Sequence, residues 1–279
     1  MVGFDVNTKT DVTEYAFVAR SAPHVPDFCR EFADETYMSL RLWVDDGGWN
    51  IYLTGAQTAR KDPRGRSIQI SIFLRGSPGA FPDDLKREDA FFLLSCWLDA
   101  CARSDLQTHP VKEDPFFARF GHKVDKDLGR FFPSAQDEEG FAAEGWAVLR
   151  SWRLEQTAAV LATDGDERFG RGGIRDEEAR RHFLACCRAV MEGRSSGGCL
   201  FLNNVMSLSD LPASIPAQEP YALLSLGDER WVSNPKGHEG ERVGTPPPQA
   251  RQGERRMVLV LPGLMLVGLA LLALLWNRH

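Results

Sequence analysis

The sequence predicts an α/β or α+β domain, in which a mixed sheet with an antiparallel hairpin packs against helices, followed by one C-terminal transmembrane helix. Three observations lead to this class. Two stretches alternate apolar and polar residues, several longer stretches repeat apolar residues with helical spacing, and one stretch near the C-terminus is apolar throughout. With 43% apolar and 26% charged residues in 279, the composition is that of a folded protein rather than a disordered one.

The alternating stretches predict the hairpin. In 47–55, Trp49, Ile51 and Leu53 alternate with other residues, and every second residue of 67–74 is Ile or Leu. The connecting "DPRG" has Asp, Pro and Gly at the first, second and fourth positions of a type I turn. Gly55 is expected to mark a β-bulge.

The other elements follow along the chain and complete one globular domain over residues 1–226. The helix at 85–102 is expected to begin at a cap from Asp83 or Asp84, and the helix at 176–192 to end at Gly193. The Phe-rich stretches 114–120 and 128–134 are expected to be connections. Further strands are predicted at 13–20, 157–166, 198–205 and 220–227, and helices at 24–36, 85–102, 137–152 and 176–192.

The segment 257–276 predicts a membrane anchor. It contains no charged residue, and its 20 residues would span about 30 Å as a helix, the thickness of the hydrocarbon core of a bilayer. Arg255 and Arg256 precede it, and Trp276 lies at its far end, where an indole favours the interface. Gly268 and Ala273 would permit a close helix contact, which leaves an oligomer open. The lipid bilayer is therefore one expected partner.

The flanking charges predict a single-pass protein whose N-terminal domain is cytoplasmic. Two arginines precede the apolar segment, and the N-terminus has no signal peptide. The region 227–256 is rich in Gly, Pro and charges, so we expect a flexible linker, and 277–279 a short tail across the membrane. Arg- and Ala-rich, Lys-poor usage is typical of a GC-rich bacterial genome and favours the inner membrane.

The charge balance disfavours nucleic acid as a partner. The whole chain has a net charge of −6. The linker contributes +1 and Arg278 contributes +1, so residues 1–226 have a net charge of −8. An acidic domain is repelled by nucleic acid and by anionic headgroups. The turn of the hairpin is the local exception, because Arg60, Lys61, Arg64 and Arg66 surround a single acid. These four cations are the candidate contact for an anion or a protein partner; the alternative is a solvated turn.

No motif specifies a reaction, a metal or a cofactor, and none is expected. The six cysteines form no C-x-x-C pair and fit reduced, structural thiols. Gly170, Gly172 and Gly173 precede a helix, but no G-K-[ST] follows, so we expect a flexible surface loop. Asp164 and Asp166 begin a calcium-loop spacing that Arg168 interrupts.

Three functions remain open at this point. The favoured one is a tail-anchored, non-enzymatic interaction, adaptor or sensor module that meets a protein partner near the membrane. The second is a membrane-acting effector, toxin-like or defence-type, whose soluble domain controls the assembly of its membrane helix. The third is an anchored enzyme that acts on an anionic small molecule through the Arg60–Arg66 turn.

Overall fold

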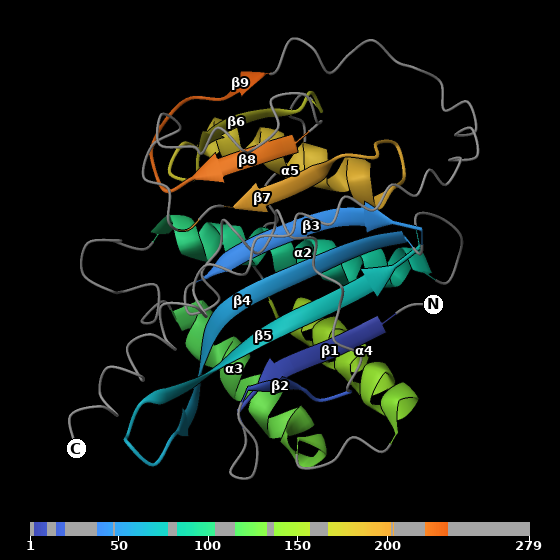
Figure 1. Ribbon diagram of the computed structural model, residues 1–279, viewed down its shortest axis with the longest axis vertical. Coiled ribbons are helices and arrows are strands. Elements are labelled where there is room, and N and C mark those ends of the chain that lie inside the picture. The colour runs from blue at the N-terminus through green and yellow to red at the C-terminus, as the bar shows by residue number, and fades with distance from the viewer. Residues whose placement is uncertain are drawn as a thin grey trace, which may run out of the picture. The chain divides into compact units, whose positions relative to one another are not determined.

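The computed structural model confirms a mixed α/β domain with a large mixed sheet (Figure 1). It describes residues 3–9, 15–19, 38–46, 48–77, 83–103, 115–132, 137–156, 167–201, 203 and 221–233. The strands are β1 (Gly3–Thr8), β2 (Ala16–Phe17), β3 (Ser39–Asp45), β4 (Gly48–Lys61), β5 (Ser67–Gly76), β6 (Gly170–Gly173), β7 (Gly198–Phe201), β8 (Tyr221–Ser225) and β9 (Val232–Ser233). The described helices are α2 (Asp83–Arg103), α3 (Pro115–Leu128), α4 (Glu138–Glu155), α5 (Glu177–Met191) and the short 3₁₀ helix η2 (Gly129–Phe131).

The nine described strands lie in the order β2-β1-β5-β4-β3-β7-β8-β6-β9. From β2 to β7 each neighbouring pair is antiparallel, whereas β8 is parallel to both of its neighbours, β7 and β6. The edge strand β9 is again antiparallel, to β6. Figure 1 shows α2, α3, α4 and α5 on the same side of this sheet. The sheet therefore combines a larger antiparallel part with a smaller parallel part, β7-β8-β6, in which α5 connects β6 to β7 along the chain.

The predicted hairpin is the best-defined part of the sheet. β4 and β5 pair as antiparallel neighbours, with Trp49 opposite Gly76 and Lys61 opposite Ser67. The register shifts between Leu53 and Ala56, and Gly55 has a φ of 86°, so the predicted bulge is confirmed. Because the apolar residues alternate, one face of the hairpin is directed into the core.

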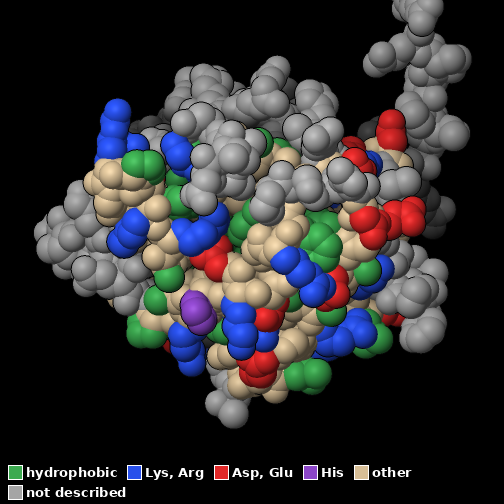
Figure 2. Space-filling view, turned by 90° about the horizontal axis from the view of Figure 1, so that it is seen from below, with side chains coloured by type: hydrophobic (Ala, Val, Ile, Leu, Met, Phe, Trp, Pro, Cys, Tyr) green, Lys and Arg blue, Asp and Glu red, His purple; other side chains and the backbone are tan. Residues whose placement is uncertain are grey.

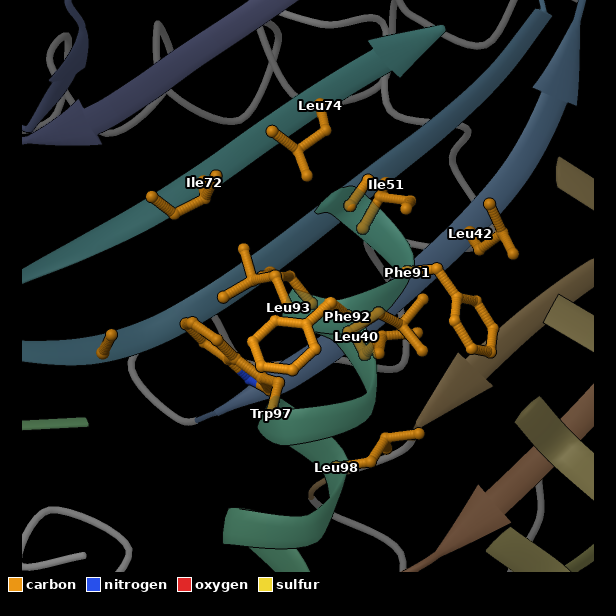
Figure 3. Close-up of a cluster of buried hydrophobic side chains, with 14 of the residues drawn as sticks. Leu40, Leu42, Ile51, Ile72, Leu74, Phe91, Phe92, Leu93, Trp97 and Leu98 are labelled. Carbon is orange, nitrogen blue, oxygen red and sulfur yellow. The ribbon is translucent and has the colours of Figure 1, made fainter. Parts of the chain in front are cut away.

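The core lies between the helices and strands β3, β4 and β5 (Figure 3). In this layer the central helix α2, with the buried side chains of Leu93 and Trp97, lies over the sheet residues Leu40 and Ile51. The four consecutive residues Phe91, Phe92, Leu93 and Leu94 project to all sides of α2, and all four are buried. A helix that is apolar all round is a central one, and here α3, α4 and α5 each pack on α2.

One charge is buried inside this helical layer. The Asp89 side chain of α2 has an exposed fraction of 0%, and its carboxylate forms ion pairs with Arg150 at 3.2 Å and Arg153 at 2.7 Å, both on α4. The two arginines remain 43% and 30% exposed. The triad fixes α4 against α2, since a buried carboxylate requires cationic partners.

Three predictions about local structure are wrong. The Phe-rich stretch that begins at Pro115 is the helix α3, whose buried face includes Phe116, Phe117 and Phe120. The glycines 170–173 form strand β6 rather than a flexible loop, and a Cβ at Gly173 would collide with the backbone of Gly227. Over 13–20, the described strand is only the pair of residues in β2.

Most of the remaining local predictions are confirmed or untested. Strands at the positions of β7 and β8 and helices at α2, α4 and α5 are confirmed, and Gly193 (φ 72°) follows α5. The cap expected from Asp83 or Asp84 is not found, because α2 already begins at Asp83; the side chains of Asp137 and Asp176, which were not predicted as caps, cap α4 and α5.

Of the linker expected at 227–256, residues 227–233 are described and end in strand β9, which pairs with β6. The rest of the linker, the helix expected at 24–36, the strand expected at 157–166 and the apolar segment 257–276 lie outside the described residues. Among the helices that are described, none has both the length and the apolar character of a bilayer span.

Candidate functional site at the β4–β5 hairpin tip

The tip of the hairpin is a tight turn that its own sequence dictates. The amide of Gly65 donates to the carbonyl of Asp62 (2.8 Å), which closes the predicted type I turn. Gly65 then adopts a φ of 78°, the left-handed conformation that glycine enters at little cost, and this allows the amide of Asp62 to reach the carbonyl of Arg66 at 2.8 Å.

The Asp62 carboxylate holds the turn from inside. Its Oδ1 accepts hydrogen bonds from the amides of Arg64 and Arg66, each at 2.9 Å, and its Oδ2 accepts from the Arg66 guanidinium at 2.8 Å. Although burial opposes the effect, the bonds from the Arg66 amide and guanidinium and from the Arg64 amide lower the pKa of Asp62. Because this carboxylate is fully engaged, it serves as a structural anchor and not as a base.

Arg60 is part of the scaffold. Its guanidinium donates to Asp125 of α3 (2.9 Å), to the carbonyl of Lys9 (2.8 Å) and to the hydroxyl of Thr8 (2.7 Å). It also lies over the ring of Phe132, 4.9 Å from the ring centre. Arg60 therefore ties the base of the tip to strand β1, helix α3 and the residue that follows η2, and its donors are already used.

Asp125 is the partner that sequence reasoning missed. Burial raises the pKa of the Asp125 carboxyl, and its pairing with Arg60 partly offsets that effect. The nearby hydroxyl of Thr58 donates its single proton to the carbonyl of Ile68 on β5 (2.9 Å). Arg60 and Asp125 are 65 residues apart, so only the fold brings them together.

The outward charge of the tip comes from the remaining cations. Lys61 donates from Nζ to the hydroxyl of Ser67 (2.6 Å), a neutral partner, and no carboxylate of the described residues forms an ion pair with it. Arg66 is paired with Asp62 at 2.7 Å, yet its side chain is 67% exposed. Arg64 is exposed at the turn, and no described side chain forms an ion pair with it. The structure thus divides the four predicted residues into one structural arginine, one paired arginine and two open cations, Lys61 and Arg64.

The surface at this end of the molecule is mixed in charge. Figure 2, viewed from below Figure 1, shows Lys/Arg and Asp/Glu side chains intermixed and hydrophobic side chains in small separate groups. On the described part of this face no apolar area is extended enough to suggest hydrophobic docking. A partner that meets the tip would therefore be recognised through charge and hydrogen bonds.

Within the described part of the chain, the cysteines and histidines do not assemble into a site. Among the described residues, no three His, Cys, Asp or Glu side chains come together as a metal would require. Cys96, Cys101, Cys186, Cys187 and Cys199 are free thiols, and all but Cys96 are buried. His182 stacks on Trp231 with ring centres 5.6 Å apart. Cys29, His24, His109, Asp164, Asp166, Arg255, Arg256 and Trp276 lie outside the described residues.

Comparison with known proteins adds no identification. No known protein family, no characterised protein and no solved structure matches the chain.

Proposed function

We propose that the protein is a membrane-tethered, non-enzymatic interaction module. Its domain hangs on a Pro- and Gly-rich linker from the apolar segment 257–276 and captures an acidic segment of a protein partner with the tip of the β4–β5 hairpin. The observation that carries the proposal is the division of labour at the tip: Arg60 and Asp62 hold the backbone, whereas Lys61 and Arg64 are exposed and have no carboxylate partner among the described residues. A preformed cationic tip binds without first having to become ordered.

Charge supports an acidic protein segment rather than nucleic acid. The domain as a whole is acidic, so a polyanion that covers much of its surface would be repelled, whereas a short acidic segment can meet the tip alone. Two exposed cations can form charge-assisted hydrogen bonds with carboxylates at low entropic cost, because the turn beneath them is fixed.

A charge-reversal experiment tests the partner surface. K61E/R64E should abolish co-purification of the partner after crosslinking in native membranes, while the unfolding temperature of the protein stays within a few degrees of wild type. R171E/R175E is the matched control, because it reverses two exposed arginines at and beside β6, at the opposite end of the sheet. Equal recovery of the partner with both double variants would refute the role of the tip. If K61E/R64E still recovers the partner but no longer binds vesicles of anionic lipid, the tip contacts lipid instead.

A separate experiment tests the tether. Deletion of residues 257–279 should release the protein from the membrane fraction into the supernatant after high-speed centrifugation. A deletion variant that still sediments with membranes in high salt would contradict the tether and leave the result for the tip untouched.

A further inference from the structure

A small cavity lies where three helix ends meet: the last turns of α2, the first turn of α3 and the residue that caps the end of α4. Its volume is about 220 Å³, below the ~300–1,000 Å³ of sites for drug-sized ligands. The cavity is separate from the hairpin contact: the first residues of α3 line the cavity, whereas Asp125, which contacts the hairpin, lies near the other end of this helix. A ligand of this cavity would therefore have the size of one ring with a substituent.

One wall of the cavity is flat and apolar. Phe116 is stacked on Phe120, with ring centres 5.9 Å apart and planes within 2°, and its edge contact with Trp152 is at 5.7 Å. These contacts fix the orientation of the Phe116 ring. Beside it, burial raises the pKa of the Cys96 thiol to about 12, and the Asp99 carboxylate adds to this effect. The thiol is thus neutral at physiological pH and acts as a polarisable apolar group that suits contact with a ring.

The charged side chains that line the cavity, Asp99, Arg103 and Arg119, carry more positive than negative charge. Asp99 forms an ion pair with Arg103, and it is also near Arg180 of α5. Burial lowers the pKa of the Arg180 guanidinium; Asp99 opposes this, and the like charge of Arg103 adds to it. Glu177 and Asp176 of α5 also oppose the effect of burial on Arg180, and Asp99 has its ion pair with Arg103.

Arg119 is the other guanidinium that lines the cavity. It donates to the carbonyl of Pro115 at 3.3 Å and lies over the Trp152 ring, 5.9 Å from its centre. Within the described residues it has no carboxylate partner. Among the described residues, the cavity therefore places a cation that has no carboxylate partner next to a fixed aromatic ring.

We propose that this cavity binds a small molecule or side group that joins one aromatic ring to one carboxylate or phosphate group. The ring packs against Phe116 and Cys96, and the anion pairs with the Arg119 guanidinium. The proposal is independent of the hairpin tip, because it uses other residues and another kind of ligand.

The test separates the ring from the charge by titrating the purified full-length protein with four probes, followed by tryptophan fluorescence and calorimetry. Benzoate and phenyl phosphate carry both features, benzyl alcohol carries only the ring, and inorganic phosphate carries only the charge. Saturable binding of benzoate or phenyl phosphate is expected, with benzyl alcohol and inorganic phosphate weaker by on the order of ten-fold or more. No saturable binding of either two-feature probe, or equal binding of benzyl alcohol, overturns the proposal.

Variants locate the binding. R119Q should weaken benzoate binding on the order of ten-fold, as expected for the loss of one charge-assisted hydrogen bond. R130Q is the control, because Arg130 is an exposed arginine that is paired with Glu144 outside the cavity. C96L removes no charge but fills the cavity, so it should abolish binding, and it replaces R119Q if the latter does not fold. Unchanged benzoate affinity in R119Q or in C96L overturns the assignment.

Discussion

Replacement of both Arg150 and Arg153 with alanine is expected to destabilise the protein by about 3–5 kcal/mol. The double variant leaves the Asp89 carboxylate without its two described cationic partners, and the Asp89 side chain has an exposed fraction of 0%. In the wild-type fold this carboxylate is covered, so the double variant has to bury the charge or rearrange the ends of α2 and α4 to hydrate it. Each single variant should lose far less, about 1 kcal/mol, because the remaining arginine still neutralises the charge.

The reverse perturbation should be milder. D89N removes the same two ion pairs but keeps the volume of the side chain, so no cavity forms. The guanidinium groups that it leaves behind are 43% and 30% exposed and can be hydrated where they stand. We expect a loss of about 1–2 kcal/mol, and the triple variant D89N/R150A/R153A should be more stable than R150A/R153A, because it contains no stranded charge.

Urea unfolding followed by tryptophan fluorescence measures these differences, since Trp152 lies on α4 between the two arginines in sequence. The four free energies form a cycle in which the coupling between Asp89 and the arginine pair is read directly. If D89N costs as much as R150A/R153A, or if the triple variant shows no recovery, burial of the carboxylate does not determine the energetics and the reasoning is refuted.

Three further predictions concern other parts of the molecule. In the same urea assay, R60A should destabilise by about 1.5–3 kcal/mol and R64A should stay within about 0.5 kcal/mol of wild type. The reason is that the Arg60 side chain bonds to Asp125, Lys9 and Thr8; similar free energies of unfolding for the two variants would contradict the division of roles. G121A should destabilise by about 1–3 kcal/mol despite the helix propensity of alanine, because the added Cβ would collide with the carbonyl of Gln57. G129A is the control and should be near neutral, because no atom lies within 4 Å of the added Cβ; equal melting temperatures of the two variants would argue against this close packing. Burial raises the pKa of Cys96 from 9.0 to about 12, so the thiol ionises first in the unfolded chain and the free energy of unfolding should fall as pH rises above about 9. C96A should reduce this pH dependence in urea titrations from about pH 8 to 10.5, and an unchanged slope would contradict the shielding of the Cys96 thiol.

The sequence was informative wherever the pattern was local. The hairpin, its turn and the Gly55 bulge could be predicted because strand alternation and the Asp-Pro-x-Gly turn are properties of adjacent residues. The starts of α4 and α5 were predicted at Asp137 and Asp176 for the same local reason, and the structure shows that both carboxylates accept from amides three residues later.

The errors in local structure arose where packing overrides propensity. Strand β3 was not predicted although Leu40, Leu42 and Val44 alternate with Ser39, Arg41 and Asp45; what the sequence could not show is that Arg41 on this strand is buried. Helix α3 was hidden by a dense run of phenylalanines, which have only modest helix propensity and become helical because three of them pack against other elements. The glycines of β6 resembled a loop, whereas the reason for them is close approach between strands.

The candidate site shows the same limit. The four cations of the tip were visible in the sequence, but their separation into structural and open residues depends on Asp125, 65 positions away from Arg60. The cavity at the helix ends joins residues from 96 to 156, and part of it belongs to a helix that the sequence did not predict. No spacing rule within a single sequence could have united those residues.

The close packing at Gly121 has a consequence for the two ends of α3. The helix backbone rests directly on the backbone of β4, so no side chain lies between them that could change rotamer and let the helix roll or slide. Fourteen residues make α3 about 21 Å long, with the cavity at its first turn and the ion pair between Arg60 and Asp125 near its last turn. α3 is thus a rigid spacer, and any displacement forced on one of its ends would have to be shared by the other.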